Sequence, residues 1–188
     1  MNYVEYGKEN KYDDNIFFQK YSQMSRSQQG LAGAGEWETL RKLLPDFKDK
    51  RVLDLGCGYG WHCIYAMEHG ASSVVGVDIS HKMLEVAKEK THFPQVEYKC
   101  CAIEDVEFPE ESFDVILSSL AFHYVADYEI LVKKIYRILK SGGKLVFTVE
   151  HPVFTAYGTQ DWHYICTFAM PCYDFRLFSN CNTKISEK

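Results

Sequence analysis

The sequence of 188 residues lacks three features that would each define a class of protein. It has no long run of uncharged apolar residues, so no segment has the roughly 20-residue length of a membrane-spanning helix. It has no block of Lys and Arg, and 21 basic residues face 26 acidic ones, so a large nucleic-acid surface is not expected. The N-terminal stretch contains no apolar segment of signal-peptide length. These absences predict a cytoplasmic protein without a membrane or nucleic-acid partner.

The seven cysteines include no C-x-x-C pair. They stand at positions 57, 63, 100, 101, 166, 172 and 181, a scatter that favours reduced structural thiols over disulfides or zinc ligands. Cys63 follows His62 directly, but neighbours on a helix point about 100° apart, and no second pair has zinc spacing. We therefore expect no metal site.

From residue 51 onward, short apolar runs alternate with helical patterns. The expected strands are residues 51–55, 72–78, 96–100, 113–119 and 144–150. The expected helices are 61–69, 81–90 with Ser80 as its cap, and one that begins after Asp127 and ends at 141–143. This alternation predicts a Rossmann-like α/β fold, with a doubly wound, mostly parallel sheet of strand order 3-2-1-4-5.

The last of these helices has a clear apolar stripe. We expect one face to carry Ile130, Leu131, Ile135, Ile138 and Leu139. Since that face is apolar, it should pack against the sheet.

The chain divides into three predicted parts: a helical lead-in over residues 1–50, a ligand-binding core over 51–155 and a tail over 156–188. In the lead-in, residues 36–44 should form a helix that packs on the sheet. The earlier segment is rich in aromatic residues, and it is either a satellite of the core or a lid over the ligand crevice. The tail shows no periodicity that commits it to a helix or a strand. We expect it to be divergent or truncated, with the final strands of the sheet missing or divergent.

The run VLDLGCGYG, residues 52–60, places three glycines directly behind the first expected strand. Glycine lets a turn tighten, adopt a positive φ and admit a ligand against the main chain. A dinucleotide loop of the form G-x-G-x-x-G would need its third glycine where Trp61 stands, so NAD is disfavoured. Asp54 also suits a cationic ligand better than a pyrophosphate.

Asp78 ends the second expected strand, 22 residues after Gly56. A carboxylate at that place can accept hydrogen bonds from both hydroxyls of a ribose. The alternative is an aspartate that caps the next helix, although Ser80 already supplies a cap. Ile79 could cover one face of an adenine.

Five motifs in this order resemble a known family: VLDLGCGYG, VVGVDIS, AIEDVEF, FDVILSSLAFHYV and LKSGGKLVFTVEHPVFT. Together they resemble the class I S-adenosylmethionine-dependent methyltransferases of the small-molecule type, which include the ubiquinone and menaquinone C-methyltransferases and carry a methyltransferase type 11 domain. The resemblance covers roughly residues 50 to 155. It implies S-adenosylmethionine as the cofactor and a small molecule as the methyl acceptor.

The resemblance also implies which residues contact each part of the cofactor. Gly56, Cys57 and Gly58 would lie under the methionine part, with Asp54 near its ammonium group. Asp78 would hold the ribose. Ile79 and Ile103 would enclose the adenine, whose N6 edge would meet Glu104 or the backbone of Ala102 and Ile103. Many relatives carry an aspartate at the position of Ala102. Ser118 and Ser119 would face the carboxylate side, and Tyr21 and Arg26 are candidate lid contacts to the carboxylate of the cofactor or substrate.

Two histidines follow strands on the crevice side, His123 and His151. Either could act as a general base if the acceptor is an O–H or N–H group, and either could instead orient a loop or pack on the cofactor. The predicted function is methyl transfer from S-adenosylmethionine to an unidentified small molecule. Two alternatives remain: a cofactor-binding module without turnover, and a nicotinamide-dependent oxidoreductase.

Overall fold

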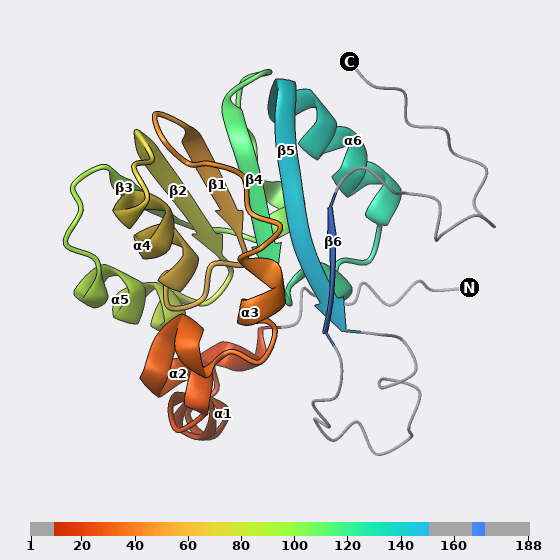
Figure 1. Cartoon of the computed structure of the whole chain (residues 1–188). Helices are drawn as coiled ribbons and strands as arrows, with labels where there is room; N and C mark the ends of the chain where they lie inside the picture. The colour runs from red at the N-terminus through yellow and green to blue at the C-terminus, as the bar shows by residue number, and fades with distance from the viewer. Residues whose placement is uncertain (1–9, 151–166, 172–188) are drawn as a thin grey trace, which may run out of the picture.

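The computed structural model describes residues 10–150 and 167–171, so His151 and most of the tail lie outside it (Figure 1). Six strands form one sheet: β1 (Arg51–Leu55), β2 (Ser73–Asp78), β3 (Val96–Cys100), β4 (Phe113–Ser119), β5 (Leu139–Glu150) and β6 (Thr167–Pro171). Their order is β3-β2-β1-β4-β5-β6. The first five are parallel, which confirms the predicted order 3-2-1-4-5.

Three longer helices connect these strands: α4 (Trp61–Glu68), α5 (His81–Lys90) and α6 (Tyr128–Ile138). The caps of α5 and α6 form as predicted: Ser80 Oγ accepts a hydrogen bond from Met83 N at 3.2 Å, and an Asp127 carboxylate oxygen accepts one from Ile130 N at 3.0 Å. These side chains take up backbone N–H groups that have no partner within the first turn of a helix.

Alternate residues of each strand point to opposite faces of the sheet, and each face packs into its own apolar cluster. Val52 of β1 packs in one apolar cluster together with residues of α3 (Trp37–Leu40) and α4. Leu53 and Leu55 pack in a second cluster with the buried face of α6. The helices therefore cover both faces, as a doubly wound sheet requires.

Two helix predictions are corrected. The helix expected over 36–44 is only Trp37–Leu40, followed by turns, and Pro45 disfavours a helical conformation at the residue before it. α6 buries Leu131, Ile135 and Ile138, but Ile130 is 58% exposed because it lies about 100° around the helix from Leu131.

The end of α6 also differs from the prediction. The helix stops at Ile138, and Leu139 already pairs with Phe113 as the first residue of β5. The next pair is Val115 with Lys144, so the four residues 140–143 bulge out of the ladder, with Gly142 at φ +73°. Sheet pairing thus extends β5 past the glycines that were expected to separate helix from strand.

The tail contributes a strand. β6 runs antiparallel to β5, with Thr167 opposite Glu150 and Pro171 opposite Val146. Of the two alternatives expected for the final strands, missing or divergent, β6 excludes the first for residues 167–171. The remaining tail expectations lie outside the described residues.

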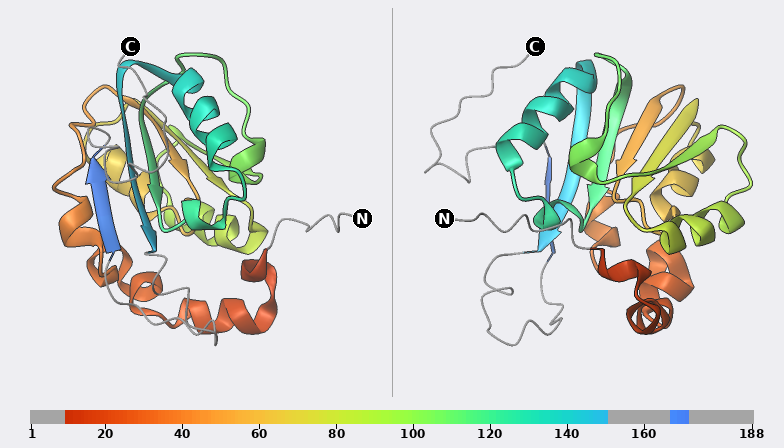
Figure 2. Two further views of the ribbon diagram at one scale, coloured as in Figure 1. Left: turned by 90° about the vertical axis from the view of Figure 1, so that its right-hand side faces the viewer. Right: turned by 180° about the vertical axis from the view of Figure 1, so that it is seen from behind.

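The N-terminal segment folds into short helices: η1 (Lys11–Asp13), α1 (Asn15–Ser22), α2 (Ser25–Gln29) and η2 (Gly30–Gly33). They lie against the edge of the sheet where the parallel strands end, as both views in Figure 2 show. Ligands of doubly wound sheets bind at this edge. The fold therefore places the lead-in over the expected ligand crevice.

Candidate functional site

The glycine loop after β1 is tied to the end of β2. Gly56 N and Cys57 N both donate to the carbonyl oxygen of Val77, at 2.8 and 2.9 Å. Gly58 has φ +51°, and a Cβ added there would meet no heavy atom within 4 Å. The loop therefore presents bare main chain to open space.

Asp78 connects this loop to the start of α5. Its Oδ2 accepts a hydrogen bond from Gly58 N at 2.8 Å, and its Oδ1 accepts one from Ser80 N at 2.9 Å. Burial raises the pKa of Asp78, the hydrogen bonds from Ser80 and Gly58 counteract part of that rise, and the charge of Asp13 adds to it. Asp78 is thus held in a fixed orientation at the wall of a cavity.

The cavity has a volume of about 410 Å³, within the range of roughly 300–1,000 Å³ that is usual for ligand pockets. It is bounded by the glycine loop, the ends of β2 and β4, and the N-terminal helices. Twelve of the predicted site residues line it: Tyr21, Arg26, Gly56, Cys57, Gly58, Asp78, Ile79, Ala102, Ile103, Glu104, Ser119 and His123.

Two predicted contacts do not line the cavity. Ser118 is buried and donates its hydroxyl to the carbonyl of Leu55 at 2.8 Å. Asp54 is also buried; its Oδ2 accepts from Cys63 Sγ at 3.5 Å, while its Oδ1 has no partner among the described residues. Burial raises the pKa of Asp54 to about 7, with the Cys63 hydrogen bond opposing this rise and the charge of Asp78 adding to it.

Aromatic side chains from the N-terminal helices close one side of the cavity. Tyr12, Phe17 and Tyr21 line it, and the ring of Tyr21 meets that of Tyr59 edge-on, with centroids 5.7 Å apart. The Tyr12 hydroxyl lies 3.3 Å from the Tyr124 hydroxyl, across the crevice. Of the two roles left open for this segment, its placement favours a lid.

Asp13 links the N-terminal segment to the start of α5 by hydrogen bonds. Its Oδ1 accepts from Ser80 Oγ at 2.6 Å and from Lys82 N at 3.2 Å, and its Oδ2 accepts from Asn10 Nδ2 at 2.8 Å and from His81 N at 3.4 Å. Burial raises the pKa of Asp13, but these hydrogen bonds outweigh burial and lower its pKa below the usual value. Asp13 thus acts as an additional cap on α5, supplied from outside the helix.

We expect Asp13→Ala to lower the free energy of unfolding by about 1 kcal/mol, the usual cost of losing a helix cap. Because the folded-state pKa is lowered, the contribution of Asp13 is present above the unfolded pKa and is lost as pH falls through the folded one. Urea unfolding at pH 7 checks the value. Glu89→Gln, on the exposed side of α5, is the control; an equal loss in both variants would contradict the capping role.

Several polar groups of the cavity were not found from the sequence. The ring of His62 and the indole of Trp61 line it, and neither His62 Nε2 nor Trp61 Nε1 has a hydrogen-bond partner among the described residues. Both ring nitrogens of His123, a residue that the sequence did indicate, also lack a hydrogen-bond partner among the described residues. Burial lowers the pKa of His123 to about 4, so its imidazole is neutral at pH 7. Buried polar groups of this kind are usually satisfied by a ligand or by ordered water.

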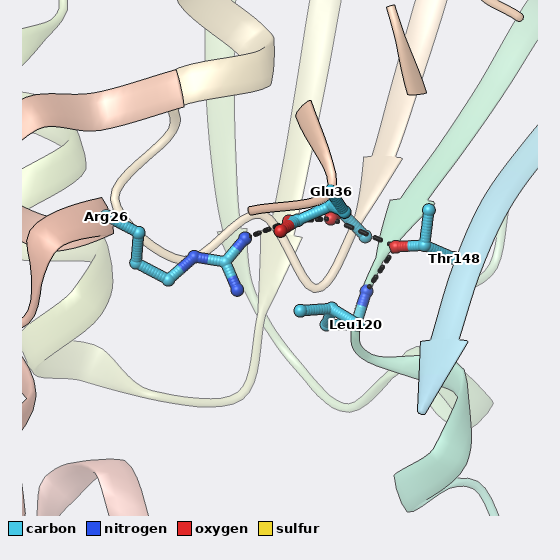
Figure 3. Close-up of polar contacts among 5 residues, drawn as sticks. Arg26, Glu36, Leu120 and Thr148 are labelled. Carbon is cyan, nitrogen blue, oxygen red and sulfur yellow. Dashed lines mark hydrogen bonds and ion pairs between the residues drawn. The ribbon is translucent and has the colours of Figure 1, made fainter. Parts of the chain in front are cut away.

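A buried carboxylate, Glu36, is the other residue that the sequence did not indicate. It forms an ion pair with Arg26 and accepts a hydrogen bond from Ser119 Oγ at 3.0 Å (Figure 3). Glu36 and Ser119 are 83 positions apart, so no sequence spacing could relate them.

Among the described residues, no helix is long and apolar enough to cross a membrane. The same residues contain no group of three His, Cys, Asp or Glu side chains placed to hold a metal ion. The cavity is lined by the glycine loop, Asp78 and residues of the N-terminal helices. A parallel sheet with a glycine loop after β1 and a carboxylate at the end of β2 defines a nucleoside-binding protein of the doubly wound class.

Comparisons with known proteins identify the family. The family model of the methyltransferase domain matches residues 53–147. An uncharacterized protein of Haemophilus influenzae is 39% identical over 158 residues, which cover 78% of this chain and 60% of that protein. Ubiquinone biosynthesis O-methyltransferase of Coxiella burnetii is 36% identical over 112 residues, which cover 58% and 47% of the two chains. The chain spans about half the length of the curated relatives it matches.

Solved structures agree with this assignment. A Listeria monocytogenes protein assigned as an S-adenosylmethionine dependent methyltransferase superposes with a TM-score of 0.65 and 57% identity, over 69% of this chain and 61% of that one. An S-adenosylmethionine dependent methyltransferase from Mesorhizobium loti gives a TM-score of 0.65 and 44% identity, over 68% and 59%. The chain belongs to the methyltransferase domain family, within the class I S-adenosylmethionine-dependent methyltransferases, as its motifs predict.

Proposed function

We propose that this protein transfers the methyl group of S-adenosylmethionine to a small molecule. The observation that carries the proposal is Asp78, which is fixed by Gly58 N and Ser80 N on the wall of the 410 Å³ cavity. A carboxylate in this position matches the two hydroxyls of a ribose.

The described residues fit this cofactor in two further respects. The open space at Gly58 leaves room for a ligand against the loop, because no side chain fills it. The cavity also contains buried polar atoms without partners, on Trp61, His62 and His123, which a ligand with amino-acid and nucleoside groups could satisfy.

We assign the contacts along the cavity as follows. Asp78 accepts the ribose hydroxyls, Ile79 and Ile103 enclose the adenine, and Glu104 or the backbone at 102–103 meets its N6 edge. Gly56, Cys57 and Gly58 support the methionine part. Arg26, with Tyr21 and Ser119 beside the same cavity, receives the carboxylate. Asp54 and Ser118 lie behind this wall, where Asp54 contacts Cys63 of α4 and Ser118 binds the carbonyl oxygen of Leu55 in β1.

The bound cofactor supplies a methyl group on a sulfonium, which is already an activated electrophile. The residues of this chain then have to place the acceptor in line and exclude water, and positioning of this kind can contribute about 7–11 kcal/mol. Tyr12 and Phe17 of the N-terminal segment line the cavity, and their aromatic rings would exclude water from the bound cofactor and acceptor.

We assign His123 to the part of the cavity that would hold the methyl acceptor. Its neutral imidazole can take up the proton of an O–H or N–H acceptor. With a pKa of about 4, His123 is a weak base, so we expect it to contribute to methyl transfer more by orienting the acceptor than by removing a proton. His151 remains a predicted second candidate, outside the described residues.

Ligand-dependent thermal unfolding tests the cofactor. We expect S-adenosylhomocysteine to raise the melting temperature, by about 2–4 °C per kcal/mol of binding free energy, because a ligand that binds only the native state stabilises it. NAD should give no shift. Stabilisation by NAD alone would instead favour the nicotinamide-dependent alternative.

Methyl transfer itself needs a second measurement. Labelled S-adenosylmethionine with a panel of small phenols and amines should yield a labelled product. Binding of S-adenosylhomocysteine without transfer to any acceptor would favour the alternative of a cofactor-binding module.

A further inference from the structure

One carboxylate oxygen joins the lid to the ends of two strands. Glu36 Oε1 accepts a hydrogen bond from Arg26 Nη2 and another from Ser119 Oγ (Figure 3). The Ser119 hydroxyl also lies 3.2 Å from Thr148 Oγ1 of β5. Arg26 belongs to α2 and Ser119 ends β4, so Glu36 links segments that are distant in the sequence.

The two members of the ion pair occupy different depths. The Arg26 side chain is 20% exposed and lines the cavity, whereas the Glu36 side chain is 5% exposed and is not part of the cavity wall. A carboxylate buried to this extent is costly unless it is paired and hydrogen-bonded. Glu36 therefore lies behind Arg26 and fixes where its guanidinium stands.

The same network holds a strained turn. Leu120 lines the cavity and has φ +54°, an uncommon conformation for a bulky residue. Its N–H donates to both the carbonyl oxygen and Oγ1 of Thr148, at 3.0 and 3.1 Å. Backbone strain of this kind persists where the surrounding structure fixes it, and it is concentrated at functional sites.

We infer that Glu36 is a positioning residue, which holds Arg26 against the amino-acid end of the cofactor and ties that end to the strained turn after β4. This inference rests on the proposed function. A guanidinium presents five N–H donors in a planar fork, so Arg26 can serve Glu36 and a ligand carboxylate at once. The pair thus orders the place where the amino-acid part of the cofactor would lie.

A different role for Glu36 would predict the opposite behaviour. If Glu36 acted only through its charge, it would weaken the attraction of Arg26 for a carboxylate, and its neutralisation would improve binding. Two conservative substitutions separate the roles. Glu36→Gln keeps the Oε1 acceptor and removes the charge, whereas Glu36→Asp keeps the charge and shortens the reach toward Arg26 and Ser119.

The test compares two ligands by calorimetry on the full chain. S-adenosylhomocysteine carries the amino-acid part, and 5′-methylthioadenosine lacks it, so the ratio of their dissociation constants reports on that end alone. We expect Glu36→Asp to reduce the preference for S-adenosylhomocysteine about tenfold, the scale of one hydrogen bond to a charged group. Glu36→Gln should keep the preference within about threefold of the wild type.

Glu38→Asp is the matched control, since Glu38 lies in α3, two residues after Glu36, with 70% of its side chain exposed, and should not change the preference. The inference is overturned if Glu36→Asp leaves the preference unchanged, or if Glu36→Gln reduces it as much as Glu36→Asp does. Arg26→Lys, which keeps the charge without the fork, should also reduce the preference. An unchanged preference in Arg26→Lys overturns the inference even where Glu36→Asp fails to fold.

Failure of the proposed function gives a different result. If wild-type protein binds neither S-adenosylhomocysteine nor 5′-methylthioadenosine, the cofactor assignment is wrong. If both bind and the variants do not separate them, only the role of Glu36 is wrong.

Discussion

Asp78→Ala is expected to weaken S-adenosylhomocysteine binding by about 1.5–3 kcal/mol, or roughly 10- to 150-fold. The substitution removes the carboxylate that we assign to the ribose hydroxyls. It also removes the acceptor for Gly58 N and Ser80 N, so the glycine loop and the start of α5 lose their shared contact. Both losses weaken the binding of S-adenosylhomocysteine.

Calorimetry measures the affinity, and circular dichroism shows whether the fold is retained. Asp78→Asn should fall between the wild type and Asp78→Ala, because its amide keeps one oxygen acceptor. Glu85→Ala, exposed on α5, serves as the unrelated control and should leave the affinity unchanged. An affinity within twofold of wild type in a folded Asp78→Ala variant would show that the ribose is held elsewhere.

The sheet could be predicted from the sequence because each parallel strand is a short apolar run between helical patterns. The strand order 3-2-1-4-5 is the expectation for a doubly wound sheet of this kind, and the structure confirms it. The boundary between α6 and β5 could not be predicted, since Leu139 continues the apolar stripe of the helix and yet pairs with Phe113. β6 was missed because it is a short segment without alternation, and its place depends on the edge of β5.

The glycine loop and Asp78 could be predicted because they stand at fixed places, the carboxyl ends of β1 and β2. Asp54 and Ser118 stand at comparable strand ends, but both are turned into the protein, and the sequence pattern does not resolve that difference. Glu36 could not be found at all, since its contacts with Arg26 and Ser119 are created only by the tertiary structure. The assigned contacts themselves remain predictions.

Gly58→Val is expected to reduce S-adenosylhomocysteine binding more than Asp78→Ala does, by roughly 100-fold or more, because a branched side chain would occupy the place of the ligand and resist the turn. Gly58 lines the cavity, and a side chain there would project into open space that no protein atom occupies within 4 Å. The methyl groups of the introduced valine would therefore occupy space that the ligand needs, without a clash with protein atoms.

A second effect of Gly58→Val has to be separated from the first, because φ +51° costs about 1–2 kcal/mol for a residue with a Cβ. Gly142→Val supplies the matched control: Gly142 has φ +73° and equally open surroundings, but it lies in the bulge of β5 and does not line the cavity. Both variants should lose similar stability in urea unfolding, and only Gly58→Val should lose binding. If the two variants bind S-adenosylhomocysteine equally well, the ligand does not lie against the glycine loop.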